Sequence, residues 1–283
     1  MARAPEPAAV VHMVKDGGLM SEIERNGVRI HFDDIGAGPP VVLGHSFLCS
    51  GEMWGPQVGP LCDRFRVVNI DERGHGRSGH LTEPFDLYDM VDDVLAVLDH
   101  LGVERAVWAG LSIGGMVAMR AAITAPKRVS GLILVDTHAG AESPYKKLKY
   151  RAMALGVKTI GVRPLLPGIS KLMFGSTTRR HNVELVTAWE ERFASVDVPS
   201  MLLGLRAVMR RDSVIDRLRQ VEVPSLVIVG DEDISLPPPC SREIASALPN
   251  SSLVVVPESG HLSSLEQPEA VTKAMIQFLD DLR

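Results

Sequence analysis

Short apolar runs alternate with longer amphipathic stretches along the first half of the chain. An unbroken apolar run of a few residues is typical of a strand that is buried on both faces of a sheet. The stretch at residues 87–101 instead spaces its apolar side chains three and four residues apart, which predicts an amphipathic helix that ends at Gly102. Strands are therefore predicted at residues 41–43, 66–70, 106–109 and 131–135, and helices at residues 53–63, 87–101 and 116–122.

The beginning of the chain predicts a hairpin at the edge of this sheet. Residues 21–25 and 29–33 are strand candidates joined by Asn26-Gly27, a pair that favours a tight turn between strands. Residues 1–20 contain prolines and scattered charge but lack the apolar core of a signal peptide. We expect residues 1–20 to be a disordered leader or, given His12-Met13, a vector-derived segment.

The alternation stops in the middle of the chain. Residues 138–212 contain no readable strand–helix unit, and helical pieces at 145–156, 178–194 and 200–211 are predicted between breaks at Pro164, Pro167, Gly168 and Pro199. The alternation then resumes, with strands predicted at 226–229 and 253–256 and helices at 240–247 and 268–282. The fold class is therefore α/β: residues 21–137 and 213–283 form a mostly parallel sheet with helices on both faces, and residues 138–212 form an inserted helical cap.

Composition and net charge limit the kinds of binding partner that we expect. The 283 residues are 45% hydrophobic, which is enough for a substantial core. The net charge of −5 gives no reason to expect nucleic acid or an anionic membrane as a partner, and no apolar run reaches the roughly 20 residues that span a bilayer. Cys49, Cys62 and Cys240 are odd in number and lack metal-ligand spacing, so we expect free thiols in a reducing cytoplasm.

A candidate nucleophile lies where the strand at residues 106–109 meets the next helix. The sequence there has the pattern Gly110-x-Ser112-x-Gly114, which places a serine hydroxyl on a turn too tight for side chains at the flanking positions. The serine is also at a helix N-terminus, where unpaired N–H groups favour developing negative charge. A serine that only capped the helix would need no glycine on both sides. We therefore interpret Ser112 as a nucleophile.

A serine needs a base to remove its proton, usually a histidine that a carboxylate orients. On a turn of this kind, the acid and then the histidine follow the serine in the chain. His261 comes after the predicted strand at residues 253–256, so it should lie at the same edge of the sheet as the serine. For the acid we favour Asp233, which follows the strand at 226–229, with Asp231 and the earlier Asp136 as alternatives.

Attack on an acyl group also creates an oxyanion. Its stabilisation requires two backbone N–H donors, and losing one raises the barrier by about 3 kcal/mol. Ile113, directly after the serine, is the first candidate donor, and Phe47, in the loop after residues 41–43, is the second.

A second glycine-rich segment, residues 71–79, is dense in charge. Its composition predicts a loop rather than a strand or helix. We interpret it as a structural loop that Asp71 and Arg73 brace.

From about residue 20 to its end, the chain resembles the α/β-hydrolase superfamily. In that family the acid is the third residue after the strand-end glycine, which implies Asp233 rather than Asp231. The family usually has His-Gly before the oxyanion residue, where this chain has Ser46. Among subgroups, the chain looks most like enol-lactonase-like and cofactor-free haloperoxidase-like proteins, and is similar to esterases that open acyl-homoserine lactones. The resemblance rests on His45-Ser46-Phe47 with Trp54 downstream, Asp71-x-Arg73-Gly74-x-Gly76-x-Ser78, Gly110-x-Ser112-x-Gly114-Gly115, Gly230-Asp231-x-Asp233 and Gly260-His261.

The resemblance and the serine together imply hydrolysis of a carboxylic ester or lactone through an acyl-enzyme. A serine at this turn weighs against epoxide hydrolase and haloalkane dehalogenase, whose nucleophile is a carboxylate. A cap rich in Met and Leu, with 5% aromatic residues overall, predicts an aliphatic pocket. Such a pocket suits the acyl chain of an acyl-homoserine lactone, which would make the protein a quorum-quenching enzyme. The chain lacks a His-x-His-x-Asp-His string, so no metal or other cofactor is expected.

Other functions remain open. Hydrolysis of a C–C bond in a diketone, or of a peptide, could use the same three residues. A ligand receptor could keep the fold while turning over little substrate. An intact serine, histidine and acid favour an enzyme over a receptor, and hydrolysis of p-nitrophenyl butyrate discriminates between the two.

Overall fold

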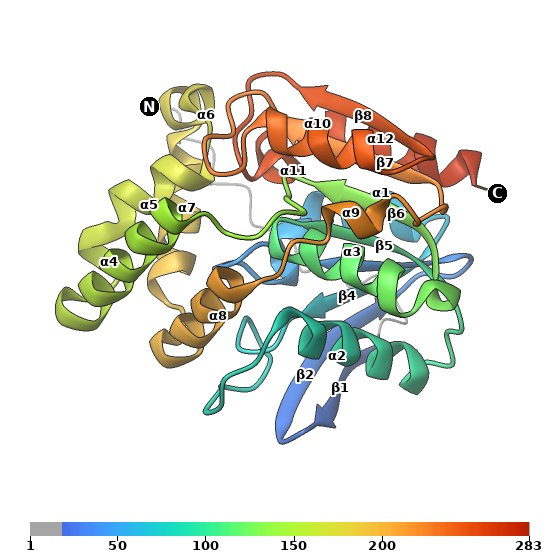
Figure 1. Ribbon diagram of the computed structural model, residues 1–283, viewed down its shortest axis with the longest axis horizontal. Coiled ribbons are helices and arrows are strands. Elements are labelled where there is room, and N and C mark those ends of the chain that lie inside the picture. The colour runs from blue at the N-terminus through green and yellow to red at the C-terminus, as the bar shows by residue number, and fades with distance from the viewer. Residues whose placement is uncertain (1–18, 283) are drawn as a thin grey trace, which may run out of the picture.

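The computed structural model describes residues 19–282, and an eight-stranded sheet lies at its centre (Figure 1). The strands are β1 (Leu19–Arg25), β2 (Val28–Ile35), β3 (Pro40–Gly44), β4 (Arg66–Asp71), β5 (Ala106–Leu111), β6 (Val129–Val135), β7 (Ser225–Gly230) and β8 (Ser251–Val256). Their order across the sheet is β1-β2-β4-β3-β5-β6-β7-β8. The pairs β1–β2 and β2–β4 are antiparallel, and all the others are parallel. The predicted mostly parallel sheet is therefore confirmed.

Helices cover both faces of this sheet, as predicted. One face carries α2 (Leu87–His100), α3 (Ile113–Thr124), α9 (Ile215–Leu218) and α10 (Pro238–Ala247). The other carries α1 (Gly55–Cys62), α11 (Ser263–Glu266) and α12 (Pro268–Asp281). Short 3-10 helices, η1 (Gly51–Trp54) and η2 (Pro126–Arg128), complete the connections. Because β5 and β7 are buried along their whole length, their sequences are continuous apolar runs rather than alternating ones.

The antiparallel edge begins with the hairpin that Asn26-Gly27 predicts. Asn26 and Gly27 have φ of 50° and 74°, and two successive positive φ values match the right-handed twist of the flanking strands. The first strand of the hairpin is two residues longer than expected, because β1 starts at Leu19. Residues 1–18 of the predicted leader lie outside the described residues, while residues 19 and 20 belong to β1.

Residues 138–212, which we call the cap segment, contain helices and no strand, and the structure describes all of them. Figure 1 places these helices together to the left of the sheet. No helix within residues 19–282 has both the length and the apolarity needed to cross a membrane. The cap-segment helices are α4 (Pro144–Ile160), η3 (Arg163–Leu165), α5 (Leu166–Met173), α6 (Ser176–His181), α7 (Val183–Ala194) and α8 (Val198–Arg210).

The prediction that Pro167 and Gly168 break the helical pattern is wrong. Pro167 occupies the first turn of α5, where its missing N–H has no intrahelical acceptor and its fixed φ suits the helix. Pro199 lies in the first turn of α8 in the same way. The pattern also joins segments that the structure separates: residues 53–63 divide into η1 and α1, and residues 178–194 divide at Asn182 into α6 and α7.

Candidate active site

Ser112 stands between the last residue of β5 and the first of α3, with φ of 56°. The flanking glycines allow this turn because the chain is crowded there. A Cβ on Gly110 would overlap the backbone of Gly114, and a Cβ on Gly114 would overlap the backbone of Gly44. Close packing of α3 against β3 and β5 therefore requires glycine at these positions. Ser112 is 7% exposed, so its hydroxyl faces a restricted space.

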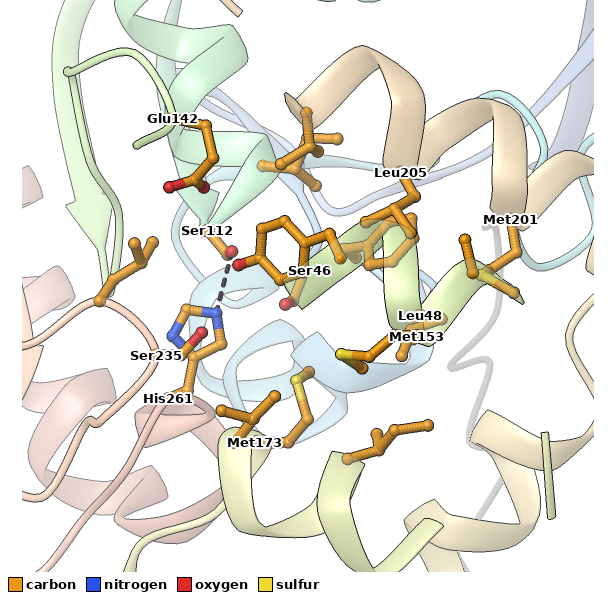
Figure 2. A pocket seen from close by; sticks show the side chains of 18 of the residues that line it. Ser46, Leu48, Ser112, Glu142, Met153, Met173, Met201, Leu205, Ser235 and His261 are labelled. Atoms are coloured by element: carbon orange, nitrogen blue, oxygen red, sulfur yellow. Dashed lines mark hydrogen bonds between the residues drawn. The ribbon is translucent and has the colours of Figure 1, made fainter. Parts of the chain in front are cut away.

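The structure brings Ser112, His261 and Asp233 together. The Ser112 Oγ lies 2.9 Å from His261 Nε2, the dashed contact in Figure 2, and His261 Nδ1 lies 2.8 Å from Asp233 Oδ2. Since a carboxylate only accepts, the Nδ1–H donates to Asp233, which leaves Nε2 to accept from the serine hydroxyl. The histidine is therefore held in the tautomer that can take the serine proton.

Asp233 is fixed from its other side by the backbone. Its Oδ1 accepts hydrogen bonds from the N–H groups of Ser235 and Leu236, at 2.7 and 2.9 Å. The residue is 2% exposed, so these bonds replace the water that the carboxyl loses on burial. Asp231, the alternative acid, is exposed, and its backbone N–H donates to Val256.

Asp136, the other alternative, does not bond to the histidine ring but links the two loops that carry Asp233 and His261. Its Oδ1 accepts from the N–H of Gly230 at 2.8 Å, and its Oδ2 lies 3.2 Å from the backbone nitrogen and 2.5 Å from the hydroxyl oxygen of Ser263. The residue is fully buried, and burial, followed by the nearby charge of Asp233, raises the pKa of Asp136 to about 8. Asp136 is thus a mostly neutral carboxylic acid at pH 7, next to the ionic partner of the histidine.

Two opposing effects set the pKa of His261. Burial of the ring acts to lower it, because the charged imidazolium loses water. The negative charge of Asp233 and its hydrogen bond to the ring act in the other direction and prevail, so the pKa of His261 is raised above 6.5. Asp233 therefore stabilises the protonated histidine that a proton transfer from Ser112 would create.

Phe47 and Ile113, the expected oxyanion donors, both line the cavity beside Ser112. Ile113 is the first residue of α3, so its N–H has no intrahelical acceptor. Within the described residues, neither N–H donates to a protein acceptor. The N–H of Gly114 donates to the carbonyl of His45 at 3.1 Å, which ties the loop of Phe47 to the start of α3.

His45 holds this loop as a neutral ring. Its Nε2 accepts from the N–H of Glu72 at 2.9 Å, and its Nδ1–H donates to the carbonyl of Ser46 at 2.8 Å. Burial, aided by the neighbouring His75, lowers the pKa of His45 to about 3. Ser46, in the place of the usual glycine, is fully buried and its N–H donates to the sulfur of Met53.

Asp71 and Arg73 brace the glycine-rich loop after β4, as the sequence predicts. Asp71 accepts from the N–H of Gly51 at 2.7 Å and from the N–H of Arg77 at 2.9 Å. Arg73 forms a buried two-point ion pair with Asp93 on α2, at 2.5 and 2.7 Å. These bonds fix the loop that packs behind His45.

The cysteines are all free thiols in the structure. Cys49 follows the Phe47 loop but is 4% exposed, and burial raises the pKa of its thiol, so it remains protonated and unreactive. No group of three or more His, Cys, Asp or Glu side chains within residues 19–282 could hold a metal ion.

A largely apolar cavity opens beside Ser112 and His261 (Figure 2). Side chains of the cap segment form much of its wall, and Met153, Met173 and Met201 are among them. The polar part of the cavity, which the sequence pattern does not predict, includes Tyr150 and a buried ion pair between Glu142 and Arg211 at 2.9 Å. The two members of that pair are 69 residues apart in a stretch without motif spacing, so the sequence offers no signal for them.

Comparison with known proteins assigns the fold family. The family model described as alpha/beta hydrolase fold matches residues 39–268. Proteins named for carbamate hydrolase and bromoperoxidase activities are similar at 31% and 28% identity.

Solved structures agree with the family model. An esterase from Thermogutta terrifontis has a TM-score of 0.86 at 32% identity, covering 94% of this chain and 99% of that one. The enol-lactonase from Burkholderia xenovorans LB400 has a TM-score of 0.86 at 27% identity, covering 92% and 100%. Est816, described as an N-acyl homoserine lactone degrading enzyme, has a TM-score of 0.78 at 29% identity, covering 91% and 100%. The chain belongs to the α/β-hydrolase fold family.

Proposed function

We propose that this protein is a serine hydrolase that cleaves carboxylic esters or lactones through an acyl-enzyme. The observation that carries the proposal is the continuous hydrogen-bonded series from Ser112 through His261 to Asp233, at the wall of an apolar cavity. Its esterase and lactonase relatives support the same class of reaction.

The reaction begins when Ser112 Oγ attacks the acyl carbon. Its proton passes to His261 Nε2, and the carbonyl oxygen becomes an oxyanion that accepts from the N–H groups of Phe47 and Ile113. The imidazolium is stabilised by Asp233, and it returns the proton to the leaving alcohol oxygen as the ester bond breaks. Water then attacks the acyl-enzyme with His261 again acting as the base, which releases the acid and restores Ser112.

The lining of the cavity supports a substrate with an aliphatic acyl group. Met side chains are flexible, so they can adapt to chains of different shape. In a lactone the leaving alcohol stays tethered to the acyl group, and the same steps open the ring. An acyl-homoserine lactone combines both features, and the similarity to Est816 supports it as a substrate, in which case the protein would act in quorum quenching.

In this proposal, residues 21–137 and 213–283 supply the three catalytic side chains. The cap segment supplies most of the wall that contacts the acyl group, since α4, α5 and α8 all contribute to the lining. The same arrangement needs no metal or other cofactor.

Ser112→Ala should reduce kcat for p-nitrophenyl butyrate by about 10⁶-fold, because it removes the atom that forms the acyl-enzyme. Steady-state hydrolysis compared with wild type measures this, and a circular dichroism spectrum checks the fold. Residual activity close to that of wild type would exclude the proposed nucleophile. A wild-type protein that binds a lactone without hydrolysing it or the ester would instead indicate a receptor.

The variants Asp233→Asn and Asp136→Asn test which of the two buried aspartates is the catalytic acid. Asp233→Asn should lower kcat by about 10⁴-fold, since it removes the partner that orients and charges the imidazole. Asp136→Asn should lower kcat by no more than about tenfold at pH 7, because Asp136 bonds to Gly230 and Ser263 rather than to the ring. The reverse ranking in side-by-side kinetics would assign the acid to Asp136.

The pH dependence of kcat/KM should follow the ionisation of His261. The base must be neutral, and its pKa is raised above 6.5, so kcat/KM should increase with pH and reach half its plateau above pH 6.5. In Asp233→Asn the charge that opposes the effect of burial most strongly is lost, so the midpoint of the residual activity should move to lower pH. A wild-type profile with its midpoint below 6.5 would contradict this reading of the site.

Asp136 should make stability decrease with pH. Its carboxyl has a pKa of about 8 in the fold, against an ordinary value of 3.8, so its contribution to stability is fully present below pH 3.8 and is lost as pH rises through 8. The free energy of unfolding of wild type relative to Asp136→Asn should therefore fall steadily between pH 5 and pH 8. Urea titrations across this range measure it, and a difference that does not change with pH would contradict the prediction.

A further inference from the structure

The charge of the chain is distributed unevenly. Residues 143–183, which we call the basic stretch, contain nine Lys and Arg residues and no Asp or Glu. Subtracting this +9 from the net charge of −5 leaves −14 on the rest of the chain. The basic stretch runs from the start of α4 to the start of α7, so a strongly positive surface region belongs to the cap segment of an otherwise acidic protein.

The first helix of the basic stretch, α4, also has an exposed apolar stripe. Tyr145, Leu148 and Leu155 are 74%, 66% and 63% exposed, and Ala152 between them is exposed as well. These residues are spaced by three, four and three positions, which places them on one side of the helix. Scattered surface leucines are normal, but an aligned set on one helix indicates a contact surface.

This stripe is not the face of α4 that packs into the protein. The opposite side of the helix carries Tyr150, Met153 and Val157, which line the cavity beside Ser112. Figure 1 shows α4 at an outer edge of the molecule, away from the sheet. The helix therefore has two apolar sides, one toward the cavity and one toward the surroundings.

Exposed basic side chains flank the stripe. Lys149 lies on one side of it, and Arg151 and Lys158 lie on the other, and all three are exposed. The helix has five basic residues and no acidic one. Helix α8, which packs beside α4, adds exposed Arg206 and Arg210 and also lacks acidic residues.

We propose that the outer face of α4 docks on an anionic phospholipid surface. A helix with an apolar stripe between Lys and Arg side chains lies in the plane of a lipid interface, with the apolar side chains among the acyl chains and the cations at the headgroups. Each basic side chain near such a surface strengthens binding, and clusters of four to eight are typical of this attraction. The docking is peripheral and requires no spanning helix.

The charges argue against two other occupants. In a symmetric contact between two copies, α4 against α4 would bring two sets of basic side chains together without an acidic residue on either helix to compensate. A nucleic acid would pair with the cations but would leave Tyr145, Leu148 and Leu155 without apolar partners. An anionic lipid interface provides apolar partners for the stripe and anionic partners for the basic side chains.

This inference goes beyond the proposed hydrolysis and does not depend on it. It also revises the expectation that the net charge of −5 implies no anionic membrane partner, because that sum hides the separation of the basic stretch from the acidic remainder. Since the inner face of α4 lines the cavity, docking would place the cavity wall beside a lipid phase in which amphiphilic esters collect.

Co-sedimentation of the full chain with unilamellar vesicles tests the proposal. Vesicles of phosphatidylcholine with about 30 mol% phosphatidylserine should bind the protein, and the binding should weaken as salt increases from about 50 to 500 mM. Vesicles of phosphatidylcholine alone should bind it much less. Absence of binding to the anionic vesicles at low salt would overturn the proposal.

Paired variants locate the surface. Leu148→Glu/Leu155→Glu should abolish co-sedimentation, whereas the control Val255→Glu, at a 43% exposed position on β8, should not. Lys149→Gln/Arg151→Gln should lower the partition coefficient about fivefold for each cation removed, and the control Lys127→Gln/Lys273→Gln should leave it unchanged.

All variants should keep wild-type hydrolysis of soluble p-nitrophenyl butyrate, since none of the changed residues lines the cavity. Equal loss of vesicle binding in the variants and their controls would contradict docking through α4. Analytical ultracentrifugation distinguishes a second copy: a dimer that Leu148→Glu/Leu155→Glu dissociates, without vesicle binding by wild type, would identify the stripe as a self-association surface. Binding of duplex DNA in preference to anionic vesicles would also overturn the proposal.

Discussion

The close packing of α3 against β3 and β5 is the constraint on which the site depends. Helix α3 approaches so near that Gly110 and Gly114 have no room for a Cβ, and the chain must turn sharply at Ser112. The same approach brings the N–H of Gly114 to the carbonyl of His45 and so fixes the loop of Phe47. One packing contact therefore positions both the candidate nucleophile and the backbone donors around it, before any catalytic side chain is considered.

The charge states of the candidate acid and base then depend on the different environments of two buried carboxyl groups. Asp233 contacts the backbone N–H groups of Ser235 and Leu236 and the histidine ring, whereas Asp136 contacts the backbone N–H groups of Gly230 and Ser263 and the Ser263 hydroxyl. Two ionised carboxylates this close would repel each other in a medium with little water. The raised pKa of Asp136 reduces that conflict at neutral pH, so Asp136 acts as a neutral brace between the loops.

Local sequence signals are sufficient to predict the sheet and the side chains that contact Ser112. The glycines around it, the strand before Asp233 and the strand before His261 each specify a turn at the same edge, and parallel strands bring such turns together. The helices of the cap segment are harder to predict, because a proline such as Pro167 fits the first turn of a helix as well as a break between helices. The ion pair of Glu142 and Arg211 depends on how the helices pack, which no spacing in the sequence encodes.

The net charge of a sequence also gives an incomplete picture of the folded protein. A net value is a sum over the chain, and it says nothing about where opposite charges lie once the chain folds. Here the fold collects the basic stretch on the cap segment and leaves the excess acid on the sheet domain, so the two parts face solvent with opposite character. Helix α4 belongs to both the cavity and that basic surface, with Met153 on one side and Leu148 on the other. The outer surface of the cap segment and the wall of the cavity therefore share one helix.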